Sequence, residues 1–286
     1  MSLVSGRNPN DIKVFKSIGQ APFTNIFSFN ATAYTNSQNY ILCSTLSNLQ
    51  GLPHKQLTTS QTVYVASTST NDNATGAGMR VAVISGLDEY FNIIQDVVTL
   101  NGQTPVESNI VFSRVFEIIG ISFGTNVSGT TGKSLSVGDI YVGTGTFTNG
   151  IPANPITGID VSEQEVGSRV GIFTVPDGYL ALFKSITCTN VPTPTDSESV
   201  NFRFDTHLFG TPSNLWYPSA PFHFDGSFQY LPEFLFFIPP RSDLQLLVSV
   251  EGNQSQRLSI ETTLELFELR WFYENKDGKN WVLLRW

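Results

Sequence analysis

Apolar and polar residues alternate along several short stretches of the chain, which predicts β-strands whose successive side chains point to opposite faces. The clearest alternation lies at residues 26–31, 62–67, 80–85, 139–142 and 200–205. Segments rich in Gly, Asn and Pro, which favour turns, separate the strands at residues 71–78, 124–132 and 149–158. Turn signals recur about every ten residues, a spacing typical of a β-sandwich or β-barrel.

Residues 88–100 fit two patterns. Tyr90, Ile93, Ile94, Val97 and Val98 match the apolar stripe of a helix, yet the segment ends in β-branched residues. The Asn-Gly pair at 101–102 follows, and this pair is a strong signal for a two-residue β-hairpin turn. We therefore predict a strand over residues 88–100, and a hairpin turn that leads into a return strand beginning at Thr104.

A segment without a pattern and a Pro-rich stretch divide the chain into three predicted parts. Residues 1–22 lack a pattern and are predicted to form an extended N-terminal arm, and residues 23–190 a β-sandwich module. A Pro-rich stretch then precedes residues 198–286, which form either a second β module or the completion of the same sandwich. Within that part, residues 264–273 and 281–286 have the pattern of a terminal hairpin. The predicted fold is all-β, a jelly-roll-like antiparallel β-sandwich, as one sandwich or as two tandem modules.

Composition narrows the class of protein. Charged residues make up only 14% of the 286 residues, against a globular average of about 25%, while aromatic residues reach 12%. The net charge of −8 argues against a nucleic-acid partner, because phosphates require a positive surface. No apolar run reaches the roughly 18 residues of a membrane span, and the N-terminus has no apolar signal segment. We expect a β protein whose surface contacts other proteins.

Two histidine–aspartate pairs are the main candidates for a metal site. Asp205 with His207, and His223 with Asp225, each lie two residues apart, so each pair shares one face of a strand. Adjacent strands could then present two His and two Asp to a transition metal. Sites of this kind usually have a further His downstream, and none follows His223. We therefore favour hydrogen-bonded surface residues, with no metal.

Other candidate chemistry is sparse. Asp160, Glu163 and Glu165 could supply the acid and base of a glycosidase, but their polar run between glycines is more typical of a solvated loop. Cys43 and Cys188 lie far apart in the sequence, which favours two small buried residues over a disulfide framework or a zinc site. We predict no catalytic residue and no cofactor.

Several short segments of the sequence resemble a known group of proteins. They are Ala66–Gly78, Ile84–Asp88, Val98–Val106, Gly138–Ile140, Thr174–Tyr179 and Ile238–Leu244. In the order and spacing of their residues they resemble segments of virion structural proteins of tailed phages and large aquatic viruses, over roughly residues 60–270. The resemblance implies a β-sandwich or jelly-roll subunit built into a virus particle, and it carries no catalytic residues.

The combined prediction is a non-enzymatic virion structural protein, assembled in the host cytoplasm. It would be a minor capsid, decoration or vertex/collar subunit that forms homo-oligomers and packs on other virion proteins. The predicted contact residues are Phe23, Phe27, Trp216, Trp281 and Trp286.

Two alternatives remain open. One is a host-receptor or carbohydrate-binding tail or fibre module, in which exposed aromatic residues stack on host surface glycans. The other is a cupin-like metal-dependent enzyme that uses His207, His223 and an Asp.

Overall fold

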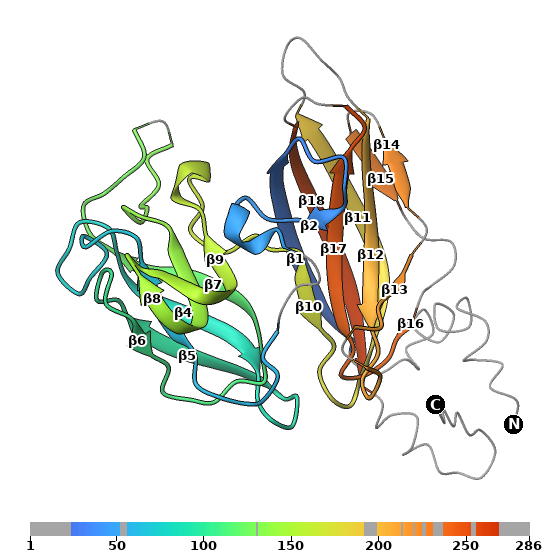
Figure 1. Cartoon of the computed structure of the whole chain (residues 1–286), viewed down its shortest axis with the longest axis horizontal. Coiled ribbons are helices and arrows are strands. Elements are labelled where there is room, and N and C mark those ends of the chain that lie inside the picture. The colour runs from blue at the N-terminus through green and yellow to red at the C-terminus, as the bar shows by residue number, and fades with distance from the viewer. Residues whose placement is uncertain are drawn as a thin grey trace, which may run out of the picture.

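The computed structural model consists of antiparallel β-strands (Figure 1). It describes residues 24–51, 56–129, 131–191, 199–212, 214–219, 221–224, 227–230, 237–252 and 256–268. Within these ranges the helices are two single 3-10 turns, η1 (Ser47–Leu49) and η2 (Val161–Glu163), and no helix is long and apolar enough to span a membrane. The prediction of an all-β antiparallel fold is confirmed.

Strands from both ends of the chain form what we call the large sandwich. Its five-stranded sheet has the order β1 (Thr24–Thr35), β18 (Gln256–Glu268), β11 (Tyr179–Val191) and β15 (Ser227–Tyr230), with β16 (Phe237–Ile238) also paired to β11. Its six-stranded sheet has the order β10 (Ile172–Thr174), β17 (Asp243–Val250), β12 (Val200–His207) and β13 (Tyr217–Pro218). In the same sheet β14 (Phe222–Phe224) pairs with β12, and β2 (Ile41–Leu42) pairs with β17.

The strands between β2 and β10 form what we call the small sandwich. Its four-stranded sheet has the order β6 (Val106–Glu107), β3 (Tyr64–Ser67), β8 (Ile140–Thr148) and β9 (Ile151–Ile159). Its three-stranded sheet has the order β5 (Ile93–Thr99), β4 (Met79–Leu87) and β7 (Arg114–Phe123). The chain therefore begins in the large sandwich, leaves it to build the small one, and returns at β10, so the two lie side by side (Figure 1).

Alternation in the sequence explains why the strands bury the faces that they do. In β12, Val200, Phe202 and Phe204 point into the core between the two sheets of the large sandwich. In β17 every residue is buried, because Leu246 faces that core while Leu247 faces a second apolar cluster on the other side. Because both faces of this strand are covered, its polar residues Asp243, Gln245 and Ser249 are buried together with its apolar ones.

That second cluster joins the two sandwiches. From the large sandwich it contains Leu42, Leu46, Leu49, Val170, Ile172 and Leu247, and from the small one Leu87, Phe91, Phe116 and Tyr141. Phe116 of β7 and Phe173 of β10 have ring centroids 5.7 Å apart across the same boundary. We call this region the junction.

The strand prediction for residues 88–100 is confirmed for β5, but the hairpin predicted at Asn101-Gly102 is wrong. The structure places the hairpin before β5, where Asp88 accepts hydrogen bonds from the backbone N–H groups of Tyr90 and Asn92, and β5 pairs with β4. Gly102 instead bonds to Asp72 and Ser67 as the chain crosses to the other sheet.

One further segment differs from its predicted structure. Residues 151–158, which were expected to form turns, lie in strand β9 (Ile151–Ile159). Leu264 lies within β18, which pairs with β1 on one side and with β11 on the other. The predicted turn of the terminal hairpin, residues 275–278, lies outside the described residues. Residues 281–286 and the predicted arm, 1–22, lie outside the described residues. The Pro-rich stretch after residue 190 joins β11 to β12, two strands of the large sandwich.

Candidate functional site

The three-stranded sheet of the small sandwich has apolar side chains on both faces. Ala82 and Ile84 of β4, Val98 of β5 and Ile118 of β7 point into the core that this sheet shares with the four-stranded sheet. On the opposite side, the register places Val97, Val83 and Ile119 in one row across all three strands. A sheet with one solvated face normally carries polar residues there, so this row needs a separate explanation.

The row belongs to a wider exposed surface. Val97 is 55% exposed, Ile119 36% and Ile121 56%. We define the outer apolar face by Val81, Val83, Val97, Ile119 and Ile121. The next row towards the junction is polar, since Gln95, Ser85 and Glu117 lie opposite one another. Partial burial raises the pKa of Glu117 above its ordinary value. The outer apolar face is thus a small apolar area with a polar border.

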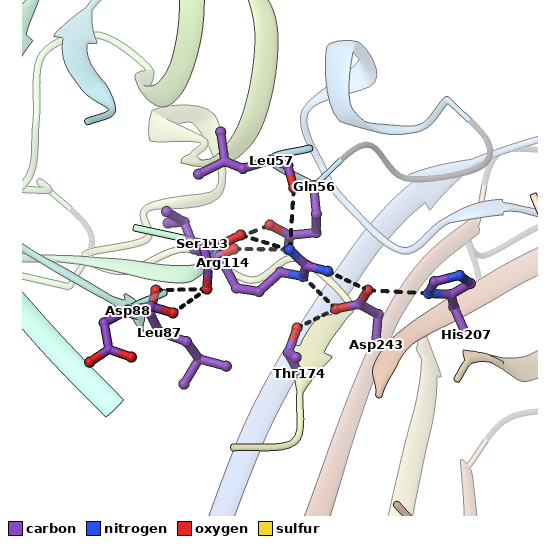
Figure 2. Close-up of polar contacts among 10 residues, drawn as sticks. Gln56, Leu57, Leu87, Asp88, Ser113, Arg114, Thr174, His207 and Asp243 are labelled. Atoms are coloured by element: carbon purple, nitrogen blue, oxygen red, sulfur yellow. Dashed lines mark hydrogen bonds and ion pairs between the residues drawn. The ribbon is translucent and has the colours of Figure 1, made fainter. Parts of the chain in front are cut away.

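A buried ionic network lies at the junction (Figure 2). Asp243 opens β17, and the sheet register sets it opposite Thr174 of β10 on one side and His207 of β12 on the other. Arg114, at the start of β7 in the small sandwich, reaches across and binds both carboxylate oxygens, with Nε 2.7 Å from Oδ1 and Nη2 3.1 Å from Oδ2. This fork geometry makes a directional link between the sandwiches.

The remaining contacts of Asp243 complete its hydrogen bonding. Thr174 donates its hydroxyl to Oδ1 at 2.7 Å, and Nδ1 of His207 lies 3.5 Å from Oδ2. Burial acts to raise the pKa of Asp243, but the hydrogen bonds from His207 and Arg114 outweigh it and hold the pKa below its ordinary value. The hydrogen bond with Asp243 raises the pKa of His207, and burial opposes that effect. The network therefore favours ionised Asp243 and charged His207.

A strained pair of residues flanks this network. Phe91 and Arg241 have backbone φ angles of 63° and 60°, in the left-handed region that bulky residues rarely adopt. The Arg241 guanidinium lies 5.5 Å from the Phe91 ring centroid and 5.1 Å from that of Phe209, and it pairs with Asp177 at 2.8 Å. Strained backbone persists only where the surroundings hold it, and here the surroundings are loops from both sandwiches.

The predicted contact residues are not brought together in the described part of the chain. Phe23, Trp281 and Trp286 lie outside the described residues, and Phe27 lies in β1 opposite Leu264. Trp216 is half-buried, with its ring centroid 5.4 Å from that of His207. Its indole Nε1 is enclosed and finds no acceptor among the described residues.

The predicted metal candidates are also separated. His223 lies opposite Asn201 in the β12–β14 pairing, whereas His207 is six residues further along β12, a distance of about 20 Å at the usual strand rise. Nδ1 of His223 lies 3.3 Å from Glu251, and Asp205 pairs with Arg203 at 2.9 Å. Asp225 lies outside the described residues. Nowhere in the described ranges do three or more His, Cys, Asp or Glu side chains gather as they would around a metal.

The carboxylates expected in a solvated loop have three different environments. Asp160 accepts a hydrogen bond from the Ser162 N–H at 2.8 Å and so caps η2, and Glu163 pairs with Arg257 of β18. Glu165 is buried, which corrects the prediction for that residue, and burial raises its pKa to about 7.

Comparison with known proteins leaves the chain without an assigned family. No family model and no curated protein matches it. Among solved structures, the infectious bursal disease virus Gx strain is 11% identical, with 85% of this chain and 75% of that chain covered and a TM-score of 0.20. The VP2 subviral particle of infectious bursal disease virus is 10% identical, with 87% and 78% covered and a TM-score of 0.17. The Cry4Aa toxin of Bacillus thuringiensis is 12% identical, with 87% and 53% covered and a TM-score of 0.20. The similarity is weak in each case.

Proposed function

We propose that this chain is a non-enzymatic structural protein of a virus particle, assembled in the host cytoplasm, which binds copies of itself and other particle proteins. The outer apolar face is the observation that supports the proposal. Val97, Val83 and Ile119 form an apolar row on a regular sheet that faces away from its own core. Exposed apolar areas with a polar border are typical of protein–protein contacts. The low content of charged residues and the sequence resemblance to virion proteins support the same function.

The size of this face indicates how it would work. Burying a half-exposed Val or Ile contributes about 1 kcal/mol, so Val97, Ile119 and Ile121 on each of two copies contribute roughly 6 kcal/mol. Association costs an estimated 4–15 kcal/mol before any contact is gained. One such contact is therefore weak between two free copies, and it becomes effective when several contacts act together in a closed assembly.

The test is to place charge on the face without disturbing the core. We expect Val97→Lys combined with Ile119→Lys to weaken self-association at least about 30-fold, because two lysines would be buried without partners. Analytical ultracentrifugation over a concentration series measures the effect, and circular dichroism checks the fold. Val127→Lys is the matched control, because Val127 is also 55% exposed but lies in the β7–β8 connection, outside the outer apolar face.

Two results would contradict the proposal. One is a wild-type protein that stays monomeric even at the highest concentration of the series, where mass action favours a weak contact. The other is a double variant that associates as strongly as wild type while keeping its fold. Loss of association in the Val127→Lys control alone would place the contact elsewhere on the molecule.

A further inference from the structure

His207 has an acceptor at each of its two ring nitrogens. Nδ1 lies 3.5 Å from Oδ2 of Asp243, and Nε2 lies 3.1 Å from the backbone carbonyl of Pro212. A neutral imidazole carries one N–H and one lone pair, whereas imidazolium carries two N–H groups. Either neutral tautomer therefore points a lone pair at an oxygen, and only the charged form donates to both.

The groups around the ring favour that charged form. On β17, Asp243 faces the ring and is shared with Arg114 of β7, and the β10 partner of Asp243 is the uncharged Thr174. On β12 itself, Asp205 lies two residues away on the same face and is paired with Arg203. The ring centroid of Trp216 lies 5.4 Å from that of His207, a separation at which an aromatic ring stabilises a cation.

We infer that His207 is a pH-dependent link. In its charged form it holds the β12–β13 connection to Asp243 at the junction, and it releases that connection on deprotonation. Pro212 is the point of attachment, since its carbonyl accepts both from His207 and from the backbone N–H of Leu215 at 2.8 Å. A carbonyl has two lone pairs and can hold both donors. The inference is independent of the function proposed above.

The released connection would affect the contact between the sandwiches. Its Phe209 is 54% exposed, and the ring centroid lies 5.5 Å from that of Phe91 in the small sandwich. The same Phe209 ring lies 5.1 Å from the Arg241 guanidinium. A proton on His207 therefore holds in place a loop that spans the junction. The pKa of His207 is raised above its ordinary value. The link is therefore formed at acidic pH and is lost as the pH rises through the raised pKa of the folded protein.

The sequence contains only three histidines, so their imidazole signals can be resolved by NMR across a pH titration. We expect one signal, assigned by its absence in His207→Gln, to titrate above the ordinary value of about 6.5, with two slowly exchanging N–H protons at acidic pH. Hydrogen exchange at the Leu215 amide, corrected for the intrinsic rate, should accelerate above that midpoint by up to tenfold per pH unit. This acceleration should be absent in His207→Gln.

His223→Gln is the control, because His223 lies on β14 against Glu251, far from the junction, and should leave the His207 titration unchanged. A His207 midpoint at or below the ordinary value would overturn the inference. Leu215 protection that is equal on both sides of the midpoint would overturn it as well. If His207→Gln does not fold, the wild-type titration and its exchange profile decide the question alone.

Discussion

Glu165 shows how one buried side chain can make stability depend on pH. Its carboxylate is almost fully enclosed, and neither oxygen has a hydrogen-bond partner among the described residues. Burial is the main reason that its pKa rises to about 7, while Arg169, whose Nε lies 3.6 Å away, acts in the opposite direction. The folded protein therefore holds the Glu165 proton more tightly than the unfolded chain does. Stability from this group is complete below the unfolded pKa of about 4.3 and is lost as the pH rises through 7.

Replacing Glu165 with Gln should accordingly stabilise the protein at alkaline pH. A pKa shift of this size corresponds to at most roughly 4 kcal/mol, so we expect the free energy of unfolding of Glu165→Gln to exceed wild type by about 1–3 kcal/mol at pH 8. At pH 4 the two proteins should differ little, because Glu165 is then neutral in the folded state and mostly neutral in the unfolded state. Urea unfolding at the two pH values measures this difference. Glu163→Gln removes the ion pair with Arg257 and a minor repulsion of the Glu165 carboxylate, so it should give a much smaller gain. A gain of equal size at both pH values would contradict the explanation.

At the scale of elements, buried polar groups decide how the loops are arranged. The β3–β4 connection closes around Asp72, which is fully buried and accepts hydrogen bonds from the Ser67 hydroxyl and from the N–H groups of Met79, Val137 and Gly138. The last two residues belong to the β7–β8 connection, so one carboxylate holds two loops together. These loops are rich in Thr, Asn and Gly, and they have few apolar side chains to fix them otherwise.

We expect Asp72→Asn to lower the free energy of unfolding by about 1–3 kcal/mol, since the amide cannot accept from every donor and leaves a buried N–H unpaired. Thermal unfolding followed by circular dichroism measures the loss. Asp88→Asn is the comparison, because Asp88 also accepts backbone hydrogen bonds, but in an exposed turn where water can replace them. A loss at Asp88 equal to that at Asp72 would show that burial is not the deciding factor.

At the scale of the whole molecule, the two sandwiches are joined by the apolar cluster of the junction and by the pair of Arg114 and Asp243. Both side chains of this pair are largely buried. Removing one partner of such a pair lowers the free energy of unfolding more than replacing both partners with apolar residues does, because a buried charge is left without its partner. The nearby pair of Arg241 and Asp177 is much more exposed, so water screens it.

Arg114→Met should therefore destabilise the protein by about 3 kcal/mol or more and separate the unfolding of the two sandwiches into two calorimetric transitions. Arg241→Met should lower the free energy of unfolding by less than about 1 kcal/mol and leave the calorimetric transition unchanged from wild type. Differential scanning calorimetry of both variants makes the comparison. Equal effects of the two substitutions would contradict the view that the buried pair links the sandwiches.

Part of the outer apolar face could have been found in the sequence. The adjacent apolar pairs at residues 93–94 and 97–98 resemble a helical stripe, but in a strand they mean that both faces are apolar. Arg114 and Asp243 carry no such signal, because they are 129 residues apart and meet only after two sandwiches have formed. His207 and Asp243 became neighbours through sheet register, which no local pattern specifies.

The sequence by itself determined where many of the strands lie, because the alternation of apolar and polar residues is a local property of the chain. It also determined the all-β class through its frequent turn residues and low charge. Only the tertiary structure decided which strands pair. In the tertiary structure β18 lies between β1 and β11, and the small sandwich is inserted between β2 and β10. The hairpin turn lies before β5, not at Asn101-Gly102. Pairing depends on burying two distant strands together, and that free energy belongs to the whole core rather than to any one segment.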